Sequence, residues 1–151
     1  MKVLILIPAR YASTRFPGKP LAEIGGRPVI QHVFEKASAV TQDVYVATDD
    51  ARIFSRVEEF GGKAVMTSIH HRSGTDRCFE AYQQIMAEHA KAFDVVVNIQ
   101  GDEPFILPEQ VEALVACFED PQIQIATLAK SFDHNADIFD SNKVKVVCSA
   151  R

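Results

Sequence analysis

Three cations gather in one short loop near the start of the chain. Arg10, Arg15 and Lys19 lie within PARYASTRFPGKP, residues 8–20, where small side chains such as Ser13 separate them. Small residues let backbone N–H groups approach an anion, and the cations neutralise its charge. The loop therefore predicts a phosphate-binding cradle. The alternative is a solvated loop whose cations only keep the surface soluble.

The common phosphate-binding motifs do not describe this loop. A P-loop requires GxxxxGK followed by Ser or Thr, but Gly18 and Lys19 are followed by Pro20 and lack the upstream glycine. The GxGxxG motif of dinucleotide-binding folds is also missing from the sequence. The sequence therefore argues against a P-loop ATPase and against a conventional dinucleotide-binding protein.

A carboxylate follows an apolar run later in the chain. Asp102 stands directly after Gly101 in NIQGDEP, residues 98–104. Mg²⁺ on a nucleotide takes one or two protein carboxylates, and phosphates and waters complete its coordination. Asp102 facing the cations of the first loop would be such a ligand, whereas Glu103 should point elsewhere because successive extended side chains diverge. The alternative is a turn aspartate that bonds its own backbone.

Two adjacent aspartates, Asp49 and Asp50, end another apolar run. Asp50 is expected to cap a helix that begins near Ala51, because a carboxylate at that position accepts from free backbone N–H groups. Asp49 is a candidate to line a cleft, although capping alone would explain the pair.

The segment HHRSGTDR, residues 70–77, follows the third apolar run. Adjacent histidines rarely converge on one ion, so His70 and His71 do not indicate a zinc site. Ser73 is expected to cap a helix. Arg77, just inside that helix, opposes the helix dipole, which points to an anion nearby.

Apolar runs alternate with segments of helical period along the chain. Helical spacing places Phe79, Tyr82, Ile85 and Met86 on one face of the third helix. The predicted helices cover residues 28–40, 51–62, 77–90 and 108–120, and the predicted strands cover 2–8, 43–50, 63–68, 94–100, 123–132 and 143–150.

This order predicts an α/β fold, a mostly parallel sheet with helices on both faces in three layers, because parallel neighbours need crossover helices. Ligands of such Rossmann-like sheets bind beyond the carboxyl ends of the strands. We therefore expect the polar loops to share one cleft within a single domain, residues 1–151.

Composition limits the class of partner. The formal net charge is -4, which argues against nucleic acid as a partner, so an anionic ligand should be small. The apolar run at residues 3–7 is too short for a signal peptide or membrane span, so a soluble, cytoplasmic protein with no membrane partner is expected. Cys78, Cys117 and Cys148 form no disulfide or zinc pattern and are expected to be buried thiols.

The motifs together resemble a known family. IPARYASTRFPGKPL, VATDD, HRSGTDR, VNIQGDEP and VKVV closely resemble the 3-deoxy-manno-octulosonate cytidylyltransferases, the CMP-Kdo synthetases of lipopolysaccharide biosynthesis. Sialic-acid cytidylyltransferases are similar more distantly, because their first loop is rich in glycine and lysine. The resemblance implies a nucleotidyltransferase-type fold and transfer of CMP from CTP to the anomeric hydroxyl of Kdo, with Mg²⁺ as cofactor and pyrophosphate as product.

The resemblance also implies roles for particular residues. Lys19, Arg10 and Asp102 would be catalytic, with Asp102 as the metal ligand. The other substrate-binding positions would be Pro8, Ala9, Ser13, Arg15, Ser73, Gly74, Arg77 and Gln100. Ser13 and Arg15 would hold the triphosphate with the catalytic cations, Gln100 would face the sugar, and the residues at 8–9 and 73–74 would border cytosine.

The family continues for many residues after the position of Arg151, carrying the rest of the sugar pocket, a second metal carboxylate and dimer contacts. The resemblance therefore implies that this chain is the nucleotide-binding part of a homodimeric enzyme and that the isolated part has little turnover. Three alternatives remain: a non-catalytic CTP-binding module, a cytidylyltransferase for another sugar acid, and an α/β scaffold whose loops bind nothing.

Overall fold

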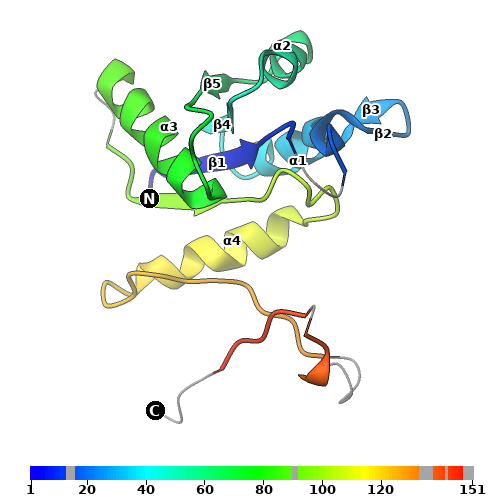
Figure 1. Cartoon of the computed structure of the whole chain (residues 1–151). Coiled ribbons are helices and arrows are strands. Elements are labelled where there is room, and N and C mark those ends of the chain that lie inside the picture. Colours follow the sequence, from blue (N-terminus) through cyan, green and yellow to red (C-terminus); the bar gives the residue numbers. More distant parts are fainter. Residues whose placement is uncertain (13–15, 90–91, 133–137, 142, 148–151) are drawn as a thin grey trace.

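The computed structural model describes residues 1–12, 16–89, 92–132, 138–141 and 143–147. Helices and strands alternate along the chain (Figure 1). In order, the elements are β1 (Val3–Ala9), the 3₁₀ helix η1 (Lys19–Leu21), β2 (Glu23–Ile24), β3 (Arg27–Pro28), α1 (Val29–Ser38), β4 (Val44–Thr48), α2 (Ala51–Glu59), β5 (Ala64–Met66), α3 (Gly74–His89), β6 (Val95–Asn98), α4 (Pro108–Ala116) and the 3₁₀ helix η2 (Cys117–Glu119).

Four strands form a fully parallel sheet in the order β5-β4-β1-β6. The central position of β1 follows from its composition, because an unbroken aliphatic run is stable where both faces are covered. Leu4, Ile5, Leu6 and Ile7 are completely buried. The predicted class, a three-layer α/β fold with a mostly parallel sheet, is confirmed.

The two faces of the sheet carry separate cores. Ile5 and Ile7 of β1 pack with the apolar sides of α1, α2 and α4. Leu4 and Leu6 point the other way and pack with α3. Alternating side chains of one strand thus belong to opposite layers, as the period of two requires.

The buried face of α3 agrees with the predicted one only in part. Of the predicted residues, Ile85 is buried and Tyr82 packs partly buried against the same core, whereas Phe79 is 60% exposed. Cys78 and Ala81 are buried instead of Phe79, because small residues such as Ala81 let the helix approach the sheet closely.

The two described cysteines also differ in exposure. Burial raises the pKa of the Cys78 thiol to about 12, whereas Cys117 is exposed at the end of α4, contrary to expectation. Cys148 lies outside the described residues.

The last two predicted strands are wrong for the described residues. Residues 123–132 and 143–147 form no strand, and the segment after α4 runs away from the sheet as an extended chain (Figure 1). Ile125, Val144 and Val147 are each about nine-tenths exposed. Their β-propensity is high, but a strand also needs a neighbour that pairs with its backbone groups, and no ladder forms between these described residues and the edge strand β6.

A short hairpin escaped the sequence analysis. Strands β2 and β3 pair antiparallel around Gly25 and Gly26, whose φ angles are 59° and 78°. Two consecutive left-handed residues make the tight turn that Gly-Gly favours, so the signal was present in the sequence.

Candidate nucleotide-binding site

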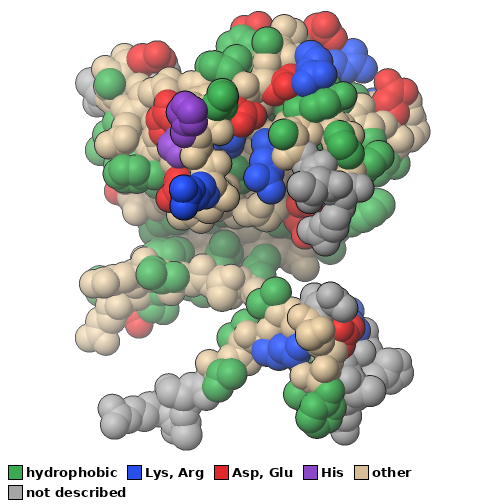
Figure 2. Space-filling model, viewed as in Figure 1, with side chains coloured by type: hydrophobic (Ala, Val, Ile, Leu, Met, Phe, Trp, Pro, Cys, Tyr) green, Lys and Arg blue, Asp and Glu red, His purple; other side chains and the backbone are tan. Residues whose placement is uncertain are grey.

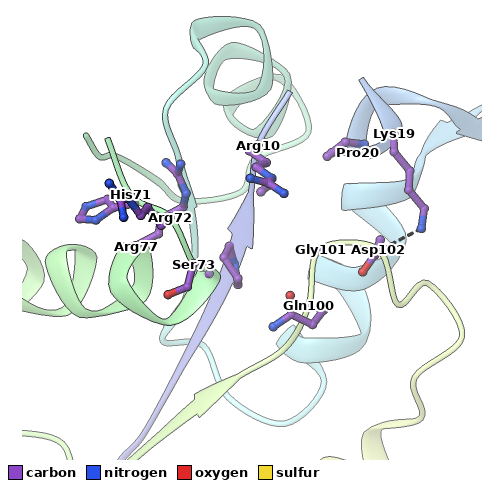
Figure 3. Close-up of a pocket in the computed structure, with 13 residues that line it drawn as sticks. Arg10, Lys19, Pro20, His71, Arg72, Ser73, Arg77, Gln100, Gly101 and Asp102 are labelled. Atoms are coloured by element: carbon purple, nitrogen blue, oxygen red, sulfur yellow. Dashed lines mark hydrogen bonds and ion pairs between the residues drawn. The ribbon is translucent and has the colours of Figure 1, made fainter. Parts of the chain in front are cut away.

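A cleft of about 240 Å³ opens beyond the carboxyl ends of the parallel strands (Figure 3). Three separate segments meet there: the end of β1 with η1, the start of α3 with the loop before it, and the turn after β6. The lining residues are Pro8, Ala9, Arg10, Lys19, Pro20, His71, Arg72, Ser73, Gly74, Arg77, Gln100, Gly101 and Asp102.

Every described residue of the predicted site lies on this cleft. Ser13 and Arg15 lie outside the described residues. Sequence reasoning missed Pro20, His71, Arg72 and Gly101 as lining residues, although Pro20, Arg72 and Gly101 each adjoin a predicted one and His71 lies two positions before Ser73. Asp49 and Asp50, which follow β4, do not line the cleft, so three of the four polar loops converge rather than all four.

Lys19 and Asp102 face each other across one end of the cleft (Figure 3). The Nζ of Lys19 lies 2.7 Å from Oδ2 of Asp102, and both side chains are nearly half exposed. Glu103 instead lines a second groove, on the side of β6 and α4, as the divergence of successive side chains requires. An exposed ion pair of this kind contributes about 0–1 kcal/mol, so a multivalent ligand can separate it at small cost.

Glycine is required where the segments meet. A Cβ at Gly101 would lie 2.8 Å from the carbonyl oxygen of Pro8, and a Cβ at Gly74 would lie 3.1 Å from Cγ of Pro8. The turn after β6 and the start of α3 therefore both press against the end of β1.

Arg77 is the most buried charged group on the cleft, with 3% of its side chain exposed. Its guanidinium donates to Oγ1 of Thr67 and to Oδ2 of Asp49, each at 2.6 Å. The anion near the helix start is thus a protein carboxylate, and the pair ties together the ends of β4 and β5 and the start of α3.

The loop before α3 is held by two sets of hydrogen bonds. Ser73 caps α3, because its Oγ accepts from the backbone N–H of Asp76 at 3.0 Å. Glu80 accepts from the backbone N–H of Ser68 at 2.9 Å and contacts Nε2 of His71. These hydrogen bonds lower the pKa of the Glu80 carboxyl below its usual range. His71 is thus paired with a carboxylate and not with a second histidine.

Asp50 caps α2, as predicted from the sequence. Its Oδ1 accepts from the backbone N–H of Arg52 at 3.0 Å, and the Arg52 guanidinium donates to both carboxylate oxygens. The side-chain hydrogen bonds from Arg52 are the main reason that the pKa of Asp50 is lowered.

The donor set fits a nucleotide-bound Mg²⁺ and not an all-protein metal cage. Asp102 is a single exposed carboxylate at the cleft, next to cations that suit phosphate. Among the described residues, no three His, Cys, Asp or Glu side chains cluster as a metal site. Mg²⁺ commonly binds through one or two carboxylates with substrate phosphates supplying further ligands, so the arrangement is sufficient for that ion.

The positive charge at the cleft comes from a few side chains in a small area of the surface. In the space-filling view, Lys, Arg and His side chains gather on the upper part of the molecule together with acidic ones, and the segment after α4 lies apart from them (Figure 2). A chain of net charge -4 therefore offers an anion one small basic site instead of a basic face. Within the described part of the chain, no helix is long and apolar enough to cross a membrane.

A parallel α/β sheet with cations and one carboxylate beyond its strand ends places this protein among the nucleotidyltransferase-type α/β folds. A nucleotidyl transferase from Methanothermobacter thermautotrophicus has the same fold, with a TM-score of 0.63 over 76% of this chain and 57% of that one, at 15% identity. The structure of CMP:2-keto-3-deoxy-manno-octonic acid synthetase complexed with CTP gives a TM-score of 0.72 over 82% of this chain and 50% of that one, at 49% identity.

The chain belongs to the cytidylyltransferase family, whose sequence model matches residues 4–151. It is 64% identical over 132 residues to the 3-deoxy-manno-octulosonate cytidylyltransferase of Phocaeicola vulgatus, which covers 87% of this chain and 51% of that relative. The enzyme of the same name from Parabacteroides distasonis is 56% identical over 97% of this chain and 59% of its own length. The chain thus spans half to three fifths of the length of these curated relatives.

Proposed function

We propose that this chain is the nucleotide-binding part of a Mg²⁺-dependent cytidylyltransferase that transfers CMP from CTP to the anomeric hydroxyl of Kdo, in lipopolysaccharide biosynthesis. The observation that carries the proposal is the cleft itself, where Arg10 and Lys19 lie with Asp102 beyond the ends of a parallel sheet. Support for the substrates comes from the relatives that bear this enzyme name and from the CTP complex of a related synthetase.

In this proposal the cations bind the triphosphate. Arg10 and Lys19 neutralise its charge, and Ser13 and Arg15 belong to the same loop. Charge neutralisation by fixed cations is the main help that a protein gives to nucleotidyl transfer, because the chemistry needs little covalent assistance.

The floor of the cleft would take the base. Pro8 and Ala9 lie next to Ser73 and Gly74 there, and together they form a surface of small and apolar atoms against which a flat ring could lie. Arg77, already neutralised by Asp49, supports this wall from behind. Gln100 lies at the mouth and would face the sugar.

Asp102 would hold Mg²⁺, and the bound ion would supply positive charge at the α-phosphate and lower the pKa of the attacking hydroxyl. Binding of the nucleotide would release Lys19 from its ion pair with Asp102, so that Lys19 turns to the triphosphate. Asp102 and Lys19 pair with each other in this structure. With nucleotide bound, Asp102 would contact the metal ion and Lys19 would contact the triphosphate.

The transfer step is a displacement at the α-phosphorus of CTP. The 2-hydroxyl oxygen of Kdo forms a bond to the α-phosphorus, the bond from that phosphorus to the bridging oxygen breaks, and pyrophosphate leaves. The hydroxyl proton passes to solvent. Lys19 and Arg10 stabilise the negative charge that grows on the phosphate oxygens.

A second acceptor has specific support. Relatives from Shewanella that are 50% identical over 97% of this chain are named 8-amino-3,8-dideoxy-manno-octulosonate cytidylyltransferase. Transfer to this amino sugar acid is therefore the alternative reaction, and a non-catalytic CTP-binding module is the alternative without reaction. We also propose a cytoplasmic location and, for the whole protein, a homodimer.

The test combines CTP binding and pyrophosphate release. Calorimetric titration with CTP and Mg²⁺ should show binding to this chain, with GTP and ATP much weaker. In the full-length protein, Lys19→Ala and Asp102→Asn should each lower pyrophosphate release by at least about 100-fold, the usual effect of removing a group that stabilises transition-state charge. Kdo and its 8-amino analogue are compared as acceptors, with the Phocaeicola vulgatus enzyme as positive control.

Each alternative predicts a different result. In the full-length protein, CTP binding without release of pyrophosphate in the presence of either acceptor would indicate the binding module. Near-normal release after Asp102→Asn would contradict the assignment of that residue to the metal.

A further inference from the structure

The two ends of the first loop meet at Tyr11 and Gly18. The backbone N–H of Gly18 donates to the carbonyl oxygen of Tyr11 at 2.9 Å. Gly18 has a φ of 73°, and a Cβ built on it would lie 2.9 Å from Cε2 of Tyr11, so the aromatic ring lies directly against this glycine. The contact closes the loop at its base, between Arg10 and Lys19, which both line the cleft.

The outer face of the Tyr11 ring is covered by Arg52 from α2. The guanidinium carbon of Arg52 lies 3.4 Å from the ring centroid, well inside the range of a cation–π interaction. Nε and Nη2 of Arg52 donate to the two carboxylate oxygens of Asp50, at 2.9 and 2.6 Å. Because Asp50 also caps α2, this stack connects the base of the loop to a rigid helix end.

Such a connection to a rigid element would fix the position of Lys19. Its side-chain ion pair with Asp102 is nearly half exposed, and exposed pairs fix geometry weakly. The position of its backbone depends instead on Gly18, to which it is bonded, and Leu21 continues the 3₁₀ turn by donating to the Gly18 carbonyl at 2.8 Å. Any freedom at Gly18 would therefore move the lysine relative to a bound phosphate.

We propose that Tyr11 and Arg52 are positioning residues, the Tyr11–Arg52 brace, that set where Arg10 and Lys19 meet the triphosphate. Neither Tyr11 nor Arg52 lines the cleft. They act through the base of the loop, and the consequence for CTP rests on the proposed function.

The first measurement needs no ligand. Arg52→Met keeps an unbranched apolar stem and removes the guanidinium group, while the Asp50 cap on α2 is retained. Amide exchange at Gly18, followed by NMR in the free protein, should become about tenfold faster, which is the scale of a cation–π interaction. Arg56→Met is the matched control, because Arg56 lies one turn further along α2 and pairs with Glu59 and Glu23 instead of stacking on Tyr11. In Arg56→Met the rate of amide exchange at Gly18 should equal that of the wild type.

The second measurement is the affinity for CTP with Mg²⁺. Arg52→Met and Tyr11→Leu should each weaken binding by up to about tenfold, and the double variant should lose little more than Tyr11→Leu alone, because both substitutions remove one contact. Tyr11→Phe keeps the ring and should retain the wild-type affinity. If the loss of CTP affinity came from a defect elsewhere in the fold, Tyr11→Phe would not retain the wild-type affinity in this way.

The outcomes separate the brace from the proposed function. Unchanged Gly18 exchange in Arg52→Met overturns the brace, whatever the ligand. Faster exchange with CTP affinity equal to that of the wild type overturns its role in positioning the cations. A wild-type protein that does not bind CTP overturns the proposed function, and the exchange data then still decide whether the brace holds the loop.

Discussion

Arg77 lies in the first turn of α3, where the helix dipole disfavours a cation, and its partner comes from a different part of the chain. Asp49 follows β4 directly, and the two groups meet at 2.6 Å because the start of α3 lies near the end of that strand. The same logic applies to Lys19 and Asp102, which are 83 positions apart in the chain. Residues that the sequence shows as isolated charges are therefore pairs in the folded protein.

Asp49→Asn should destabilise the protein strongly. The substitution leaves the Arg77 guanidinium, 3% exposed, without its carboxylate, and breaking a buried pair from one side costs about 3–5 kcal/mol. Urea unfolding measures the loss. Adding Arg77→Met should restore part of it, because the unpaired charge is removed as well.

The exposed pair of Arg27 and Glu35 is the control for that experiment. Their side chains are 50% and 44% exposed, so Glu35→Gln should change the free energy of unfolding by less than about 1 kcal/mol. Equal losses for Asp49→Asn and Glu35→Gln would show that the buried pair has no special role.

At the scale of elements, α3 shows why helical period alone does not select the buried face. The sequence places apolar side chains on two neighbouring stripes of this helix. The sheet accepts the stripe of Ala81 and Ile85, since the side chains opposite, Leu4 and Leu6, leave little room. Phe79 is left at the surface.

Ile85→Ala and Phe79→Ala should therefore differ. Ile85 is 1% exposed, and its truncation should cost about 2–5 kcal/mol through lost burial and the cavity that remains. Phe79 is 60% exposed, and its truncation should change stability by no more than about 0.5 kcal/mol. Thermal and urea unfolding of the two variants measure both losses, and a larger loss at Phe79 than at Ile85 would contradict the exposure of Phe79 in this structure.

For the molecule as a whole, the nucleotide cleft and the segment after α4 are independent parts. The cleft is built by β1, α3 and the turn after β6, which pack on the two cores of the sheet. The described residues after η2 form no strand, and several of their apolar side chains are almost fully exposed. Only residues 126–128 line a groove with β6 and α4.

A chain ending at Asp120 should thus keep its fold. We expect its free energy of unfolding to lie within about 1 kcal/mol of that of the whole chain, because largely exposed apolar groups contribute little burial. A chain ending at Ile106 lacks α4 and the buried Val111, and it should be much less stable. A strong loss on truncation at Asp120 would mean that the later residues pack on the body.

The sequence by itself determined the helices and the strands of the parallel sheet up to α4, and the polar loops that line the cleft, but not the β2–β3 hairpin. These features follow from local information: apolar periodicity, a cap such as Asp50, and motifs that stand directly after strands. The family resemblance supplied the roles that spacing alone left open.

Only the tertiary structure decided which residues pair with each other. It brought Asp49 to Arg77, Lys19 to Asp102 and Arg52 to Tyr11, and it selected which stripe of α3 is buried. It also left the described residues of 123–132 and 143–147 outside any strand, although their composition favours strands. The physical reason is the same in each case: burial and pairing depend on what the rest of the chain places opposite a residue, and local sequence does not contain that information.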